Sequence, residues 1–262
     1  MPQICSEAVV LRTWPVREAD LVVSFFTRDY GLLKGIAKSA LKSRKRFGGA
    51  LEPMTQARAW FAERPRQELV RLDQLEILSS PLAGRVDHAR LAVLCFFAEL
   101  LDESLPERDP QETVYRLLIA VLDQMHTAPS SSNEPSRVEP HRNEPWMPLT
   151  YFQLWITRLM GLLPNLAHCT VCNEPLRPGE VYFHPLRDGL LCASHRSAGS
   201  EPLSTDSWQL AQRILRAPIA AFADEPFPRR RAQDLRRFTL QSIERHLERK
   251  LRSSESLARL GS

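Results

Sequence analysis

The sequence lacks the features that would direct it into a membrane or out of the cell. It has no run of 18 or more apolar residues, and its N-terminus shows no charged segment followed by an apolar core. We therefore expect neither a membrane span nor a secretion signal. Cysteine is also scarce, because five cysteines, an odd number, cannot form a dense disulfide framework. This composition favours a reducing cytoplasm.

Common catalytic motifs are missing as well. The chain contains no Walker A sequence, no H-E-x-x-H and no G-x-S-x-G. The P-C-x-x-C half of the zinc deaminase signature is absent, because a histidine precedes Cys169. We therefore predict that the protein is not an enzyme. A zinc hydrolase would need an open metal position and a general base, and we identify neither.

Charge is spread unevenly along the 262 residues. Residues 1–80 carry 13 Lys and Arg against nine Asp and Glu, residues 229–252 carry nine against three, and residues 81–228 carry 12 against 18. Two basic ends around an acidic middle favour a polyanionic partner that is held at two places.

Residue patterns divide the chain into a strand-rich part and a helical part. Apolar and β-branched runs predict five short strands, at residues 4–13, 21–27, 32–37, 54–62 and 68–77, although the last is also compatible with a short helix. Helical periodicity follows at residues 86–105, from about residue 110, at 149–163 and at 229–251. We predict an α+β protein in which a five-stranded OB-fold barrel (residues 1–80) precedes an all-helical domain (residues 81–262).

One segment of the helical part has a different composition. Residues 127–145 contain four prolines and many small polar side chains, with a valine as the only sizeable aliphatic residue. Such a segment cannot bury enough apolar surface to order itself. We predict a disordered insertion.

The most basic stretch of the barrel region is residues 34–49. Six of its sixteen residues are basic and none is acidic: Lys34, Lys38, Lys42, Arg44, Lys45 and Arg46. Glycine and serine lie between them, so we expect a flexible loop between strands. Such a loop suits a phosphate backbone, since neutralising phosphates releases counterions. A solvated surface loop would have the same composition.

Two further features extend this candidate nucleic-acid surface. Phe47 follows Arg46 in a loop that we expect to be exposed, which makes it a candidate for base stacking. In the predicted helix 229–251, Arg245, Arg249 and Arg252 lie roughly opposite the apolar stripe. Surface arginines also serve simply as a solvated face, so this second site depends on the charge excess at the chain's end.

A cysteine and histidine cluster predicts a metal site. Cys169 and Cys172 form one close pair, and Cys192 and His195 form another after 19 intervening residues. This spacing is typical of a zinc ribbon or knuckle, in an excursion that we place at residues 166–199. His168 and His184 are alternatives for the fourth ligand. Four protein ligands would leave no open position, so we expect structural Zn²⁺.

These motifs together resemble the RecO family of bacterial recombination mediators. The resemblance covers nearly the whole chain and is most specific at residues 7–12 (EAVVLR), 20–31 (DLVVSFFTRDYG), 37–38 (AK) and 43–54 (SRKRFGGALEPM). The family's usual glycine after the Ala-Lys pair is Ser39 here, its usual Tyr-Gly-Glu turn is replaced by residues 14–18, and residues 127–145 look inserted. Only some members have the zinc ligands, and this chain has all four.

The resemblance implies a function in DNA repair and recombination, in the cytoplasm and at the nucleoid. A member of this family binds single- and double-stranded DNA and anneals complementary strands. It also helps to load RecA, together with RecR, onto strands covered by the single-stranded-DNA-binding protein. The alternative from the residues alone is a zinc-ribbon regulator that binds DNA or RNA without annealing it.

The predicted insertion gives a first test. Deleting residues 129–144 should leave the melting temperature and the strand-annealing rate nearly unchanged, because long surface loops add little closure entropy. Calorimetry and an annealing assay on the deletion variant check this. Loss of folding would show that the segment is an ordered element.

Overall fold

The computed structural model describes residues 2–63, 67–83, 86–125 and 144–260. Its contacts divide the chain into two compact units, Met1–Ser131 with Leu251–Ser262, and Ser132–Lys250. The predicted insertion at residues 127–145 lies almost wholly outside the described residues, so its disorder stays a prediction. The predicted domain boundary at residue 80 also stays a prediction. None of the helices in the described ranges has the length and hydropathy needed to cross a membrane.

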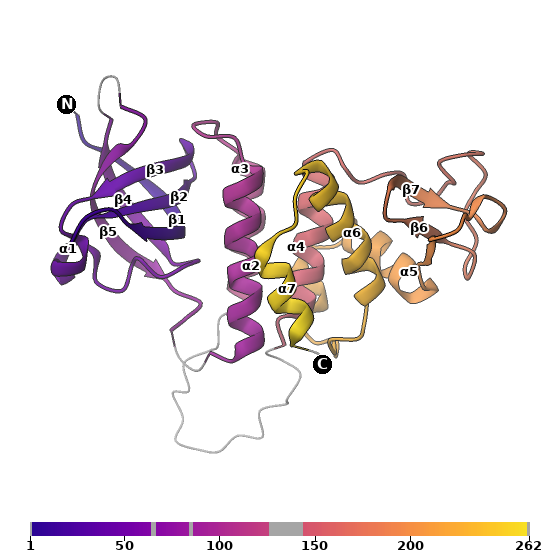
Figure 1. Cartoon of the computed structure of the whole chain (residues 1–262). Helices are drawn as coiled ribbons and strands as arrows, with labels where there is room; N and C mark the ends of the chain where they lie inside the picture. The colour runs from indigo at the N-terminus through magenta and orange to yellow at the C-terminus, as the bar shows by residue number, and fades with distance from the viewer. Residues whose placement is uncertain (1, 64–66, 84–85, 126–143, 261–262) are drawn as a thin grey trace, which may run out of the picture. The chain divides into compact units, whose positions relative to one another are not determined.

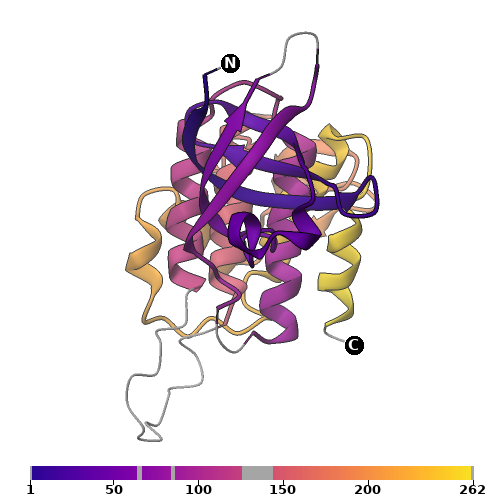
Figure 2. The same ribbon diagram turned by 90° about the vertical axis from the view of Figure 1, so that its left-hand side faces the viewer.

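The first unit begins with a closed five-stranded barrel (Figures 1 and 2). Its strands follow the order β1-β2-β3-β5-β4, and only the β3–β5 pair is parallel. Their bounds are Ile4–Pro15 (β1), Leu21–Thr27 (β2), Gly31–Ala37 (β3), Gln56–Ala62 (β4) and Val70–Ser79 (β5). This architecture confirms the predicted OB-like barrel, including a strand rather than a helix near residues 68–77.

Strand β1 closes the barrel because it is long enough to pair with two neighbours. Its first half pairs with β4, from Ile4 opposite Phe61 to Val9 opposite Gln56, and it pairs with β2 from Ala8 onward. The register shifts between Val10 and Arg12, as in a β-bulge, which bends a strand around a barrel. Inside, the rings of Phe25 and Phe61 meet edge to face with centroids 5.8 Å apart.

Besides the short helix α1 (Arg44–Phe47), the described part of the first unit contains α2 (His88–Ser104), α3 (Glu112–Met125) and α7 (Arg252–Arg259). Asp87 caps α2 by accepting a 2.7 Å hydrogen bond from the Arg90 N–H. The Glu99 carboxylate of α2 accepts hydrogen bonds from the backbone N–H groups of Arg252 (3.0 Å) and Ser253 (2.7 Å). A carboxylate at this position satisfies free N–H groups at the start of α7 and complements the helix dipole.

The connection between α2 and α3 lies against the barrel at β3. The Arg108 N–H donates a 2.9 Å hydrogen bond to the carbonyl of Leu32. The Arg108 side chain also pairs with Glu63 at 2.9 Å. Gly31, at φ +69°, makes this approach possible, since a Cβ there would lie 2.2 Å from the Asp109 carbonyl oxygen.

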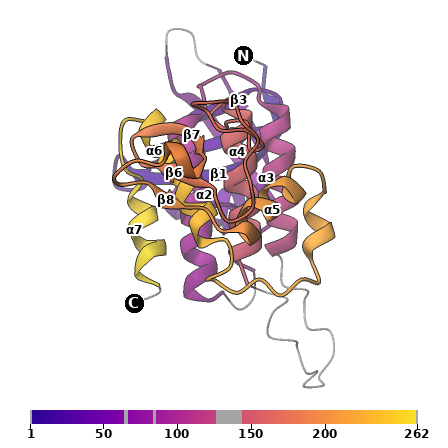
Figure 3. The same ribbon diagram turned by 90° about the vertical axis from the view of Figure 1, so that its right-hand side faces the viewer.

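The second unit combines helices with a small sheet (Figure 3). Its helices are α4 (Trp146–Leu159), α5 (Thr205–Ile214) and α6 (Gln233–His246), and its sheet has the order β7-β6-β8. The strands are β6 (Tyr182–His184), β7 (Arg187–Leu191) and β8 (Glu201–Pro202), with 3-10 turns η2 (Ala193–His195) and η3 (Ile219–Phe222). The predicted cysteine and histidine pairs lie in the segments beside this sheet, Cys169 and Cys172 before β6 and Cys192 and His195 after β7.

The expected single helix 229–251 is wrong. Helix α6 ends at His246, Glu248 has φ +55°, and a separate helix α7 starts at Arg252. A left-handed residue cannot continue a right-handed helix, so the chain turns there. Periodicity did not reveal this break because Leu247 and Leu251 both fit a continuous apolar stripe.

The close approach at Gly31 gives a second test. Gly31→Ala should lower the free energy of unfolding by about 2–5 kcal/mol, from left-handed strain plus the overlap with Asp109. Gly49→Ala is the matched control, since Gly49 has φ +72° but its added Cβ would meet only Ile77 at 3.4 Å. If urea unfolding shows that both variants lose the same free energy of unfolding, left-handed strain alone acts and the overlap with Asp109 adds nothing.

Candidate metal centre and nucleic-acid interface

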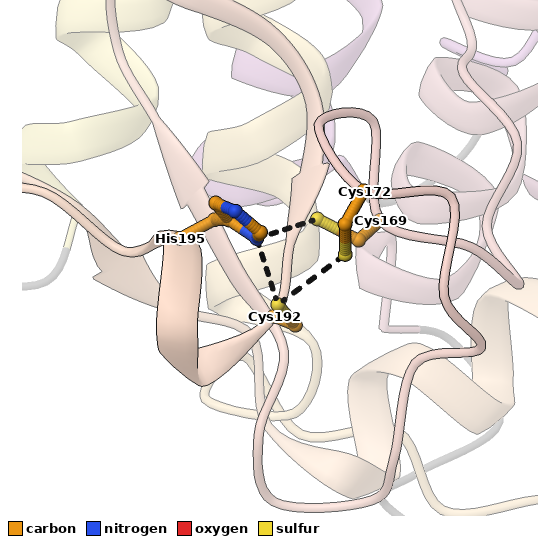
Figure 4. A group of neighbouring side chains, drawn as sticks. All are labelled: Cys169, Cys172, Cys192 and His195. Carbon is orange, nitrogen blue, oxygen red and sulfur yellow. Dashed lines mark hydrogen bonds between the residues drawn. The ribbon is translucent and has the colours of Figure 1, made fainter.

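The four predicted ligand residues converge in the second unit (Figure 4). The ligand atoms of Cys169, Cys172, Cys192 and His195 all lie within 4.8 Å of one another. The His195 Nδ1 is 3.3 Å from the Cys192 Sγ and 3.8 Å from the Cys169 Sγ, and the Sγ atoms of Cys172 and Cys192 are 3.9 Å apart. A tetrahedral ion with bonds of about 2.0–2.3 Å places its ligands roughly 3.5–3.8 Å apart. The cluster can therefore hold a metal ion.

Two tight turns present these ligands. After Cys172 the chain turns at Asn173, which has φ +59° and donates its N–H to the Cys169 carbonyl at 2.9 Å. In the second turn, the His195 N–H donates to the Cys192 carbonyl at 3.1 Å. Gly189 lets the two turns approach, because a Cβ there would lie 2.0 Å from the Thr170 Cγ2. The two turns and this close approach together bring the two ligand pairs into one cluster, although 19 residues separate them in the sequence.

The backbone also prepares Cys169 for a metal. Burial opposes ionisation of its thiol, but hydrogen bonds from the backbone N–H groups of Cys172, Cys192 and Val171 outweigh it and lower the pKa of Cys169 to about 6. The thiolate is the form that binds metals, so Cys169 is poised to bind one near neutral pH.

The alternative histidines lie outside the cluster. His184 accepts a 3.1 Å hydrogen bond from the Leu186 N–H, and its other ring nitrogen is 3.2 Å from the Ala198 carbonyl. His168 is likewise not in the group of converging ligand atoms. His195 therefore supplies the fourth ligand position.

The basic segment, residues 34–49, is folded rather than an open loop. It forms a 3-10 turn, η1 (Ala40–Lys42), and a short helix, α1 (Arg44–Phe47). Ser39 lies in the left-handed region at φ +52°, and its N–H donates a 2.7 Å hydrogen bond to the Asp20 carboxylate. The Arg46 guanidinium donates to the Lys38 carbonyl at 2.7 Å. The expected flexibility is therefore wrong for this segment.

Phe47 is not the exposed ring that we expected. It is 1% exposed and packs in the barrel core together with Ala40 and Ala50. The Arg46 guanidinium lies 5.0 Å from its ring centroid. The end of the barrel needs an apolar side chain to exclude water, and Phe47 supplies it. Its ring is not available to stack on a base.

The cations of the segment fall into two groups. Lys34 forms a 2.6 Å ion pair with Glu107, which raises the pKa of Lys34, and Arg46 is bonded within the segment. The other cations are exposed and have no acidic partner among the residues that the structure describes: Lys38, Lys42, Arg44 and Lys45. Elsewhere on the barrel, Arg58 pairs with Glu76 and Arg71 with Asp73. Unopposed charge is thus concentrated in this segment.

Sequence reasoning missed one neighbouring cation, Arg17. It is exposed in the turn between β1 and β2, and this turn contacts the basic segment through a 3.2 Å hydrogen bond from the Leu41 N–H to the Ala19 carbonyl. A lone arginine in a turn carries little signal by itself. Its place in the first loop of an OB-fold, where such barrels bind nucleic acids, could have identified it.

The outer face of β2 and β3 is covered by helices of the same unit. Ser24 donates a 2.5 Å hydrogen bond to Asp102 of α2, and Phe26 packs against Tyr115 of α3 with centroids 5.6 Å apart. All seven residues of β2 are buried. OB-folds commonly bind oligonucleotides on this face. Here the β2 side of this face is closed to them, whereas Lys34 and Ile36 of β3 stay partly exposed.

The three C-terminal arginines do not share one helix. Arg245 of α6 bonds to Asp188 and to the Pro185 carbonyl, so its guanidinium is engaged inside the second unit. Arg249 is exposed after the end of α6. Arg252 is exposed at the start of α7, which belongs to the first unit. A DNA-binding role for these residues stays a prediction.

A closed OB-like barrel, a helical C-terminal part and a Cys3His cluster define a mixed α+β class of protein. The chain belongs to the recombination protein O family. The model "Recombination protein O N terminal" matches residues 1–81, and "Recombination protein O C terminal" matches residues 85–255. Membership supports a role in DNA repair and recombination.

Curated relatives agree over nearly the full chain. DNA repair protein RecO of Koribacter versatilis (strain Ellin345) is 50% identical over 246 residues, which cover 94% of each chain. DNA repair protein RecO of Anaeromyxobacter sp. (strain K) is 31% identical over 100% of this chain and 98% of the relative. The protein of the same name from Syntrophotalea carbinolica is 30% identical over 99% and 96%.

The metal centre gives a third test. Cys172→Ser should lower both the bound metal, measured by elemental analysis, and the melting temperature, because the free energy of metal binding contributes to folding. Cys5→Ser is the control, since Cys5 is exposed on β1 and is not in the cluster. DNA affinity per folded molecule should change little. Metal-free protein with an unchanged melting temperature after chelation would contradict the assignment.

Proposed function

We propose that this protein binds single- and double-stranded DNA, anneals complementary strands and assists RecA loading in repair and recombination. Its partners would be RecR and the single-stranded-DNA-binding protein, and it would act in the cytoplasm at the nucleoid. Family membership supports this role, since the relatives are named DNA repair proteins. The proposal assigns no covalent chemistry to the chain.

The observation that carries the proposal is the group of unopposed cations at one end of the barrel. Lys38, Lys42, Arg44 and Lys45 are exposed, while buried Phe47 and the Ser39–Asp20 hydrogen bond fix the segment that carries them. Cations on a folded backbone lose less freedom when they bind a phosphate backbone than cations on a mobile loop. Arg17 extends the same surface from the neighbouring turn.

Annealing then follows from electrostatics. Two DNA strands repel each other through their phosphates, and a cationic surface that binds one strand lowers the repulsion felt by the second. The strands can then stay close long enough to pair. Such a surface has no need of base-specific contacts, because base pairing supplies the sequence selection.

The metal is proposed to be structural Zn²⁺. Three thiolates and one imidazole at tetrahedral spacing are a ligand set typical of zinc. Four protein ligands close the coordination sphere, so the ion would stabilise the turns around β6 and β7. It would not activate water.

A second candidate function rests on the Cys3His cluster alone. Zinc ribbons also occur in regulators that bind DNA or RNA without annealing it. Annealing assays on naked DNA and on DNA covered by the single-stranded-DNA-binding protein separate the two functions. Binding without faster annealing on either substrate would favour the regulator.

A salt series tests the basic segment. Lys42→Gln with Lys45→Gln should weaken binding to single-stranded DNA, because two phosphate contacts are lost. The plot of log affinity against log salt should flatten by about 1.4, at roughly 0.7 for each contact. Fluorescence anisotropy at several salt concentrations measures both effects.

The matched control removes the same charge elsewhere. Arg58→Gln with Arg71→Gln also takes two cations from the barrel, but both arginines are paired with acids. If the two double variants lose equal affinity for single-stranded DNA, the net charge of the barrel explains the loss and the basic segment is not the DNA-binding site. An unchanged salt slope for the lysine variant would also reject the segment and leave Arg249 and Arg252 as the remaining candidates.

A further inference from the structure

Two exposed apolar side chains lie on the elements that form the cationic end of the barrel. Leu41 of η1 is 62% exposed, and Val16 of the turn between β1 and β2 is 50% exposed. Single exposed apolar residues are common on protein surfaces. These two differ because they lie on adjoining elements that also carry the unopposed cations Arg17, Lys38 and Lys42.

Backbone hydrogen bonds hold these two elements together. The Leu41 N–H donates to the Ala19 carbonyl at 3.2 Å, and the Val16 N–H donates to the Asp20 carbonyl at 3.1 Å. The Asp20 carboxylate in turn accepts from the Ser39 N–H at 2.7 Å. The turn and η1 therefore form one scaffold, which fixes the backbone positions of Val16 and Leu41 relative to each other.

The chemistry of this surface selects its ligand. Apolar side chains beside fixed cations match a molecule that offers flat apolar faces along a chain of negative charges. Unpaired bases on a phosphate backbone have this property, whereas a duplex stacks its bases inside and presents mainly phosphates. The turn also carries two acids. Glu18 is exposed, whereas the carboxylate of Asp20 accepts a hydrogen bond from the Ser39 N–H.

The β2 side of the β2–β3 face cannot serve this ligand, because every residue of β2 is buried and α2 and α3 contact this strand. A strand bound to this barrel must therefore follow another surface. The end formed by residues 16–20 and 38–45 combines exposed apolar side chains with unopposed cations.

We propose that single-stranded DNA crosses this end of the barrel, with Val16 and Leu41 in contact with unstacked bases and the neighbouring cations on the phosphates. This inference rests on the proposed function and adds the path and the strand preference. It assigns selectivity for single strands to two aliphatic side chains rather than to the aromatic ring of Phe47.

A loss-of-contact variant tests the proposal. Leu41→Ser with Val16→Ser should weaken binding to oligothymidylate roughly three- to tenfold, because apolar contact with the bases is lost. The salt slope should stay unchanged, since no phosphate contact is removed. Affinity for a duplex of the same length should also stay unchanged. Leu91→Ser, at a 41% exposed position on α2, is the control and should bind like the parent.

A gain-of-contact variant tests it from the other side. Leu41→Trp should strengthen binding to oligothymidylate and show quenched tryptophan fluorescence when the DNA binds, because an indole stacks on bases better than an isobutyl group does. The parent protein supplies the background signal of its own tryptophans. Equal quenching by the duplex, or no change in affinity, would contradict the proposal.

The outcomes also separate this inference from the function beneath it. If the Lys42 and Lys45 variant loses DNA affinity while the Leu41 and Val16 variant does not, the cationic site stands and the base contact is rejected. If the lysine variant keeps its affinity and salt slope, the proposed site itself fails. Equal losses on single strands and duplex for the apolar variant would also reject the base contact.

Discussion

The packing of α2 and α3 on the outer face of β2 and β3 determines what the barrel can do. The connection between the two helices packs closely as well, because Gly31 leaves room for the backbone at Asp109. Two pairs make the packing specific: Asp102 of α2 with Ser24, and Glu107 of the connection with Lys34. Part of a surface that OB-folds use to bind nucleic acids is therefore buried against helices of the same unit. A nucleic acid bound to this barrel would have to contact another surface, and the proposed one is the end that carries the basic segment.

The elements that could be predicted from the sequence are those with local causes. Strand β2 has the predicted bounds because its apolar run is bordered by Asp20 and by the turn before Gly31. The metal cluster follows from short ligand spacings, which fix each pair of ligands within one turn. In both cases the information lies within a few residues.

Phe47 and Lys34 show what the sequence could not reveal. A phenylalanine after three basic residues looks exposed, yet Phe47 of α1 packs in the barrel core beside residues of the strands. Lys34 looks like part of a cationic loop, yet its partner Glu107 is 73 positions away. Only long-range closure of the barrel, and the return of the chain after α2, decide which side chains remain free.

The assignment of α7 to the first unit changes how the chain divides. Both the first strand and the last helix belong to that unit, so the second unit is a long excursion between two segments of it. A fragment that stops near residue 81, where the N-terminal family match ends, would contain every barrel strand but none of the helices that cover buried β2 side chains such as Phe26, which packs against Tyr115 of α3. Each such side chain contributes about 1.5–3 kcal/mol when buried. The first unit therefore extends past the barrel to α3, and α7, from the other end of the sequence, completes it.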